Sequence, residues 1–205
     1  AGVNYRIRFE YFQEGGGAAA SFTWKRKNET RDLFIEHLNK ADMIVACFGH
    51  SSDSEAEGGD RSFFLPEADS QLIARIAKCK KPIIGVVNAG GNIGMQSWEP
   101  SLKGLLWGWY AGQEGGHAIA DVLFGKVNPS GKLPMTFEKK WEDNPAYNSY
   151  HDPDGDKHVK YTEGIYIGYR GYDKLGRDVQ YPFGYGLSYT SFKLSDMVAS
   201  APNAD

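Results

Sequence analysis

Two apolar runs separated by an amphipathic segment constrain the fold of this chain most strongly. The runs "MIVACFG" (43–49) and "PIIGVVNAG" (82–90) carry no charged side chain, which is typical of strands that are buried on both faces of a parallel sheet. Between them, the segment 66–80 repeats its apolar residues at the spacing of one helix face: Leu72, Ile73, Ile76 and Ala77. The order strand, helix, strand predicts a parallel sheet that is covered by helices.

The same alternation continues on both sides of this unit. Two further segments have helical patterns and two have strand patterns: 29–42 and 112–125 are helical, and 103–110 and 131–137 are strand-like. The second helix is expected to end at Gly125, because glycine commonly follows the last turn of a helix. We therefore predict an α/β fold over residues 28–137, a three-layer α/β/α sandwich with a mainly parallel sheet. Turn-forming residues dominate 138–192, which should wrap the sandwich as an ordered loop.

The first 26 residues follow a different pattern. In "NYRIRFEYF" (4–12) apolar and charged side chains alternate, which is the period of a half-buried antiparallel strand. A glycine-rich turn follows, and "SFTW" (21–24) begins a second strand. These residues predict an N-terminal β-hairpin remnant, which is too small to be stable alone.

Charge and hydropathy argue against two classes of partner. The formal net charge of −3 provides no basic field for nucleic acid, and no apolar run approaches the roughly 18 residues of a membrane span. We therefore expect no nucleic-acid partner and no membrane partner. The cysteines Cys47 and Cys79 form no disulfide framework and are expected to be buried or half-buried thiols.

Carboxylates are crowded in the segment that follows the first apolar run. Four acidic residues lie within eight positions: Asp53, Glu55, Glu57 and Asp60. Open parallel sheets bind ligands beyond the carboxyl ends of their strands, and the segment after the second run reaches the same edge. We refer to residues 50–61 as the acidic loop and to residues 89–94 as the glycine-rich loop. Both are candidate parts of a ligand site.

A calcium site, a nucleotide site and a serine hydrolase each fail on the sequence. The acidic loop matches the opening of an EF-hand loop, but the twelfth position is Phe64, which cannot bind the ion. The glycine-rich loop has Ala89 where the dinucleotide fingerprint needs glycine. The G-x-S-x-G motif of a serine hydrolase is absent from the sequence. We expect no metal and no cofactor.

A carboxylic acid that donates a proton is the remaining chemistry. Cleavage of a glycoside uses two carboxyl groups, one of which is protonated to assist the leaving oxygen. A crowd of like charges raises the pKa of one of its members, so the acidic loop is a candidate source of such an acid. The alternative is a solvated loop with an Asp60–Arg61 salt bridge. Spacing does not choose between Glu55 and Glu57, because both side chains point the same way on an extended loop.

Four motifs along the chain occur together and in one order. They are "EGGDRSFFLP", "WGWYAGQEGGHAIADVLFGKVNPSGKLPMTF", "YTEGIYIGYRGYD" and "YPFGYGLSYTSF". Over residues 30–193, this set resembles family 3 of the glycoside hydrolases. The resemblance implies a (β/α)8 barrel followed by an (α/β)6 sandwich, of which this chain would be the sandwich. It also implies a retaining, exo-acting glycosidase whose nucleophilic aspartate lies on the barrel.

In the β-glucosidase-type members of that family, the acid/base is the glutamate just before G-x-D-R, which matches Glu57. The resemblance thus implies that this chain supplies Glu57 to a barrel domain of the same polypeptide. The substrates would be β-linked oligosaccharides or glycosides that end in a non-reducing β-D-glucosyl-type residue. The family's serine–aspartate nucleophile motif is absent here, so the chain alone is expected to be inactive. Two other motif glutamates, Glu114 and Glu163, are expected to be structural, and the sequence assigns no substrate-binding residue.

The resemblance also suggests domain boundaries. Residues 1–26 are similar to the end of a protective-antigen-like β-sandwich insertion, residues 27–193 would form the sandwich domain, and 194–205 would lead toward an absent fibronectin type III-like domain. The alternative function is a non-catalytic carbohydrate-binding or interaction module of the same fold. The sequence leaves the sugar and the compartment open, and a periplasmic or secreted location is favoured over a cytoplasmic one.

Overall fold

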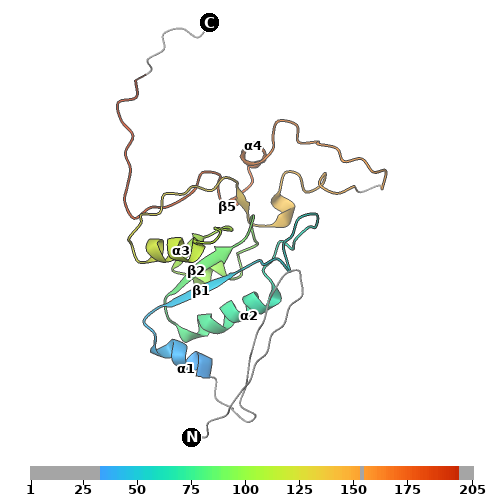
Figure 1. Ribbon diagram of the computed structural model, residues 1–205. Helices are drawn as coiled ribbons and strands as arrows, with labels where there is room; N and C mark the ends of the chain where they lie inside the picture. Colours follow the sequence, from blue (N-terminus) through green and yellow to red (C-terminus); the bar gives the residue numbers. More distant parts are fainter. Residues whose placement is uncertain (1–32, 153–154, 199–205) are drawn as a thin grey trace.

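A parallel three-stranded sheet forms the centre of the molecule (Figure 1). The computed structural model describes residues 33–152 and 155–198, so the hairpin expected at residues 1–26 lies outside the described part. The strands are β1 (Ile44–Gly49), β2 (Ile83–Asn88) and β3 (Gly104–Trp107), and they lie in the order β1-β2-β3. Because both pairings are parallel, the carboxyl ends of all three strands meet at one edge.

Helices lie on both sides of this sheet. They are α1 (Leu33–Lys40), α2 (Glu67–Ile76) and α3 (Gly115–Leu123), and Figure 1 shows the sheet between α2 and α3. The predicted three-layer α/β/α arrangement with a parallel sheet is therefore confirmed. Gly125 follows the end of α3 with a left-handed φ of 73°, where glycine is favoured. None of the helices in the described residues is long and apolar enough to cross a bilayer.

The two apolar runs differ in burial. In β2, Val86 and Val87 are fully buried, as expected for a central strand. In β1, alternate residues are buried, while Val45 is 50% exposed and Cys47 is exposed. The prediction of burial on both faces was therefore wrong for β1: in the described part of the chain, one face of this strand packs into the core and the other is left exposed. The prediction for the cysteines was likewise wrong for Cys47, whereas Cys79 is buried.

A separate antiparallel pair lies beyond the main sheet. It consists of β4 (Phe137–Glu138) and β5 (Val179–Tyr181). The predicted strand 131–137 is thus reduced to its end, and it does not join the parallel sheet. Pro134 has no backbone N–H to donate to a ladder, and the segment before it is held by Leu133, which exchanges two 2.8 Å backbone hydrogen bonds with the 184–185 turn.

The segment after β4 is mostly ordered loop, as predicted, but it contains one helix that the sequence did not indicate. Helix α4 (Tyr169–Leu175) begins after Gly168 and ends at Gly176, both of which have positive φ. Its buried residues are Gly171 and Tyr172, so it has no apolar stripe long enough to be recognised. The described residues also include three short 3-10 helices: η1 (Ala77–Cys79), η2 (Glu99–Ser101) and η3 (Trp141–Asp143).

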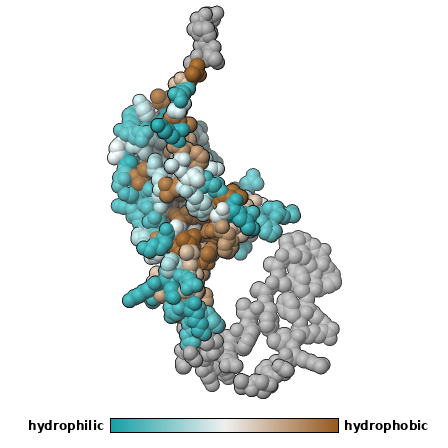
Figure 2. Space-filling view, turned by 90° about the vertical axis from the view of Figure 1, so that its left-hand side faces the viewer, coloured by the Kyte–Doolittle hydropathy of each residue, from teal (hydrophilic) through white to brown (hydrophobic). Residues whose placement is uncertain are grey.

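The hydrophobic core extends from the sheet into the glycine-rich loop. Side chains of α2 pack against β1 and β2, and the same core includes Ala89, Ile93 and Met95, which are at most 1% exposed. Apolar side chains therefore anchor the loop after β2 to the core, at the edge of the sheet where the strands end. On the surface that Figure 2 draws, apolar residues gather in a band across the lower part of the described chain.

Candidate active site

The acidic loop leaves the sheet at a firmly held point. The backbone N–H of Gly49, the last residue of β1, donates to Asp69 Oδ2 on α2 at 3.0 Å. The next residue, His50, donates its backbone N–H to Asn88 O at the end of β2 at 2.8 Å. A Cβ at Gly49 would collide with Asn88 O, so the chain requires glycine here. The start of the acidic loop is thus fixed to both α2 and β2.

A tight turn opens the loop. Ser51 O accepts the backbone N–H groups of Ser54 at 2.9 Å and Glu55 at 2.8 Å, and Ser54 Oγ lies 3.0 Å from Nδ1 of the buried His50. Burial lowers the pKa of His50, the Arg61 guanidinium lowers it further, and nearby carboxylates oppose this only in part. His50 is therefore neutral at neutral pH and supports the turn through its ring.

Glu55 turns inward and joins three segments of the chain. Its Oε2 accepts hydrogen bonds from the Tyr110 phenol at 2.6 Å and the Gly90 backbone N–H at 3.2 Å. Its Oε1 lies 3.3 Å from Nε of Arg61, in an ion pair whose side chains are only 20% and 18% exposed. A Cβ at Gly90 would lie 2.5 Å from Glu55 Oε1, which explains a glycine at this position. Glu55 thus ties the acidic loop to the loops after β2 and β3.

These contacts hold Glu55 in its ionised form. Partial burial raises the pKa of its carboxyl, but the hydrogen bonds from Tyr110 and Gly90 and the charge of Arg61 outweigh burial and bring the pKa below its ordinary value. Burial and the same hydrogen bond raise the pKa of Tyr110 to about 12, so the phenol stays protonated and donates. The prediction that crowding raises a carboxyl pKa is reversed at Glu55, which is poorly suited to donate a proton.

Glu57 lies in the opposite environment, although only one residue separates it from Glu55. Its side chain is exposed, and it forms no hydrogen bond or ion pair with any other residue that the structure describes. The chain then reverses at Gly58, which has a φ of 78° and open space around its Cα. The structure therefore separates the two glutamates that the sequence could not distinguish: one is engaged by neighbours and one is presented to solvent.

The remaining motif carboxylates have local partners. Asp60 Oδ1 accepts a hydrogen bond of 2.7 Å from the Tyr150 phenol. Arg61 forms its ion pair with Glu55 and not with Asp60, the partner that the sequence suggested. Glu114 lies 2.7 Å from Nδ1 of His117 at the start of α3. Glu163 Oε2 accepts from Ser149 Oγ at 3.3 Å. Within the described chain, no group of three His, Cys, Asp or Glu side chains is arranged to hold a metal ion.

Tyr110 is a partner of the acidic loop that the sequence interpretation missed. It lies just after β3, and the rule that ligands bind where parallel strands end would have pointed to it. Its phenol reaches across the edge of the sheet to the loop that follows β1. The glycines of the glycine-rich loop were noted for a nucleotide fingerprint, but here Gly90 and Gly91 leave room for the side chains of Glu55 and Arg61.

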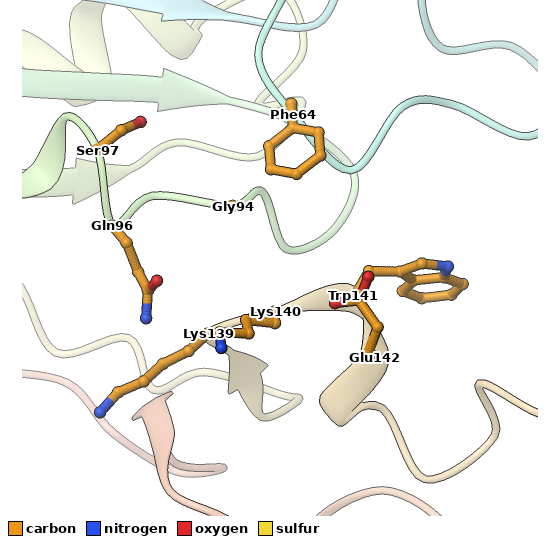
Figure 3. A pocket seen from close by; sticks show the side chains of 8 residues that line it. All are labelled: Phe64, Gly94, Gln96, Ser97, Lys139, Lys140, Trp141 and Glu142. Carbon is orange, nitrogen blue, oxygen red and sulfur yellow. The ribbon is translucent and has the colours of Figure 1, made fainter.

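A pocket with a volume of about 230 Å³ lies near Phe64, three residues beyond the acidic loop. It lies between the segment that follows the glycine-rich loop and the segment that follows β4, and it is lined by Phe64, Gly94, Gln96, Ser97 and residues 139–142. Figure 3 shows Gln96 directed toward Lys139 and Lys140, while the indole of Trp141 points away from them. The lining contains none of the four carboxylates of the acidic loop, so the pocket does not enclose Glu57.

Comparison with known proteins places this geometry in a family. The model of the "Glycosyl hydrolase family 3 C-terminal domain" matches residues 7–169. A probable β-glucosidase K of Emericella nidulans is 43% identical over 171 residues, covering 83% of this chain and 20% of the relative. A putative β-glucosidase of Schizosaccharomyces pombe is 36% identical over 216 residues, covering 96% of this chain and 25% of the relative.

Solved structures give the same result. The β-glucosidase of Kluyveromyces marxianus in complex with glucose superposes with a TM-score of 0.74 at 38% identity, over 81% of this chain and 20% of that protein. β-Glucosidase 3B of Thermotoga neapolitana in complex with glucose superposes with a TM-score of 0.73 at 38% identity, over 82% of this chain and 24% of that protein. The chain thus spans about a fifth to a quarter of the length of the relatives it matches.

Proposed function

Because the chain belongs to family 3 of the glycosyl hydrolases, as the C-terminal domain of β-glucosidase-like proteins, we propose that it supplies the general acid/base of a retaining, exo-acting β-glycosidase. The acid/base is Glu57. A barrel domain of the same polypeptide supplies the nucleophilic carboxylate and most contacts to the sugar. The substrate is a β-linked oligosaccharide or glycoside with a terminal non-reducing β-D-glucosyl-type residue, a choice supported by the β-glucosidase relatives.

One observation carries this proposal: the acidic loop holds one glutamate in an ionised, hydrogen-bonded state and leaves the next one exposed. Glu55 has three partners that favour its anion. Glu57 has a free carboxyl on the same loop, beyond the carboxyl end of β1, where open parallel sheets bind ligands. An acid/base must gain and lose a proton during turnover. The partners of Glu55 oppose its protonation, whereas Glu57 has no such partner among the residues that the structure describes.

The proposed roles follow the retaining mechanism. Glu57 donates its proton to the glycosidic oxygen as the bond to the anomeric carbon breaks, and the barrel carboxylate forms a covalent bond to that carbon. The alcohol leaves with the proton from Glu57. The Glu57 carboxylate then takes a proton from a water molecule, whose oxygen attacks the anomeric carbon and releases the barrel carboxylate. The enzyme returns to its starting protonation state.

The proposal includes a division of the longer polypeptide. Residues 1–26 are the end of an inserted β-sandwich, residues 27–193 are the domain that carries Glu57, and residues 194–205 lead to a following domain. Since the nucleophile lies on the barrel, this chain by itself is expected to release no glucose from a glycoside. Adding the barrel domain in trans or in cis is expected to restore hydrolysis.

The proposed function is tested by the dependence on the leaving group. In the full-length enzyme, Glu57→Gln is expected to lower kcat/KM on alkyl β-glucosides by about 10²–10⁴-fold, the usual contribution of a positioned acid/base. On 2,4-dinitrophenyl β-glucoside, whose leaving group departs without a proton, kcat/KM is expected to change much less. An equal loss on both substrates would contradict the assignment of Glu57.

A further inference from the structure

Glu138 is a buried carboxylate that the proposed chemistry does not use. It lies at the end of β4 and is 4% exposed, and among the residues that the structure describes it is the one acidic side chain in the buried class. A carboxylate is rarely buried unless hydrogen bonds satisfy its oxygens, because its removal from water is costly. Here Asn144 Nδ2 donates to Oε1 at 3.1 Å and Asn92 Nδ2 donates to Oε2 at 3.0 Å. The phenol of the buried Tyr172 is a third hydrogen-bond partner.

Asn92 is the partner that connects this carboxylate to the candidate site. It belongs to the glycine-rich loop and is also 4% exposed. Its Nδ2 group is fixed twice, since it donates to both the side chain and the backbone oxygen of Glu138, each at 3.0 Å. With the side chain held from below, the backbone of this residue has a defined orientation, and its carbonyl oxygen faces the acidic loop.

That carbonyl oxygen holds Arg61. Nη2 of the guanidinium donates to Asn92 O at 2.6 Å, and Nη1 donates to Ser62 O at 3.1 Å. A Cβ at Gly91 would lie 2.7 Å from Nη2, so the guanidinium lies directly against the loop backbone. The third nitrogen, Nε, pairs with Glu55. The three nitrogens of this guanidinium therefore contact three different residues: Asn92, Ser62 and Glu55.

These contacts bracket the exposed glutamate. Glu55 and Arg61 are held against the edge of the sheet on either side of Glu57, so the five residues between them form a short arch with both ends fixed. We propose that Asn92 and Glu138 form a buried positioning pair, which orients Arg61 and thereby sets the direction in which the arch presents Glu57. This inference rests on the proposed role of Glu57, and it assigns neither residue a contact with substrate.

The positioning pair can be broken without altering the arch itself. Asn92→Ala removes the donor to Glu138. Glu138→Gln keeps the size of the side chain, but it replaces one acceptor oxygen with an NH2 group. That group then faces one of three neighbouring donors (Asn92, Asn144 or Tyr172), and at least one hydrogen bond is lost. As a matched control, Glu99→Gln alters a glutamate that accepts from the Tyr181 phenol at 2.9 Å, near the amino end of β3.

The test compares these variants in the full-length enzyme on two substrates. For an acid displaced by about 1 Å, catalysis falls by up to about 10²-fold. Asn92→Ala and Glu138→Gln are therefore expected to lower kcat/KM on alkyl β-glucosides by about 10–100-fold and on 2,4-dinitrophenyl β-glucoside by less than about threefold. Glu99→Gln is expected to change both values by the same small factor. Thermal unfolding of each variant is recorded alongside. If Asn92→Ala does not fold, Asn92→Asp decides the test, because it replaces the donor Nδ2 with an oxygen that cannot donate to Glu138.

The outcomes separate this inference from the proposed function. If Glu57→Gln shows the leaving-group dependence and the positioning variants do too, the pair has the proposed role. If Glu57→Gln shows it but Asn92→Ala and Glu138→Gln lose activity equally on both substrates, the pair is merely structural and the inference is wrong. If Glu57→Gln itself shows no such dependence, the proposed function is wrong, and the inference that rests on it is wrong as well.

Discussion

The phenol of Tyr110 donates a 2.6 Å hydrogen bond to Glu55, which joins the loop after β3 to the loop after β1 across the edge of the sheet. This contact fixes the protonation of both groups: the carboxyl is held ionised and the pKa of the phenol rises to about 12. It also withdraws Glu55 from the surface. Glu57, two residues further along the loop, stays exposed.

Removing this phenol should weaken the acidic loop. Tyr110→Phe deletes a hydrogen bond to a charged group, which typically contributes about 1.5–3 kcal/mol. We expect a lower thermal unfolding midpoint and a loss of kcat/KM on alkyl glucosides of about threefold to thirtyfold, because the arch that carries Glu57 loses one support. The control is Tyr189→Phe, whose similarly exposed phenol donates at 2.9 Å to a neutral acceptor, Val122 O, and whose loss should matter less. Equal effects of the two variants would contradict the structural role of Tyr110.

The ionised state of Glu55 predicts how stability depends on pH. Its pKa in the folded protein lies below its ordinary value of 4.5, so folding favours the carboxylate. The stabilisation is fully present above the ordinary pKa and is lost as the pH falls through the lowered pKa. The difference in unfolding midpoint between the parent and Glu55→Gln should therefore be largest at neutral pH and shrink on acidification.

The matched control for this experiment is Asp53→Asn, which alters an exposed carboxylate of the same loop. Its unfolding midpoint should stay close to that of the parent across the same pH range. A difference for Glu55→Gln that grows as the pH falls would show that the sign of the pKa shift is wrong.

The close packing at Gly90 gives a prediction about stability. A Cβ at this position would lie 2.5 Å from Glu55 Oε1, whereas one at Gly59 would meet nothing within 4 Å. Gly90→Ala should therefore destabilise the protein by about 1–3 kcal/mol, as overpacking does, and should lower activity with it. Gly59→Ala should be neutral or slightly stabilising, because alanine restricts the unfolded chain. Denaturation of the two variants by urea checks this difference.

The sequence correctly predicted the strands and helices at the centre of the sandwich. The apolar run that became β2 is central and was correctly interpreted. The run that became β1 looks the same in sequence, but only one of its faces is buried in the described structure, because the burial of a face depends on which distant segments pack on it. Likewise, the residues around Pro134 have the composition of a strand, while their pairing with the turn at residues 184–185 involves contacts far apart in the chain.

The acidic loop could be located from the sequence, but the roles of its carboxylates could not be derived from spacing. Position at the carboxyl end of an apolar run placed the loop at the edge of the sheet. Which glutamate turns inward depends on Tyr110 and Gly90, which are 55 and 35 residues away from Glu55. The resemblance to a known family selected Glu57. The contacts of Glu55 now give a physical reason why Glu55 is less suitable than Glu57 as the acid.

The central claim is that Glu57 acts as the acid/base, and azide tests it most directly. With 2,4-dinitrophenyl β-glucoside, Glu57→Ala forms the covalent glycosyl-enzyme but lacks the base for the attacking water. Azide needs no such base, so it should accelerate turnover of Glu57→Ala and yield β-glucosyl azide, with retained configuration. Glu55→Ala should show no acceleration and no glucosyl azide. Rescue of Glu55→Ala instead, or of neither variant, would contradict the assignment of Glu57.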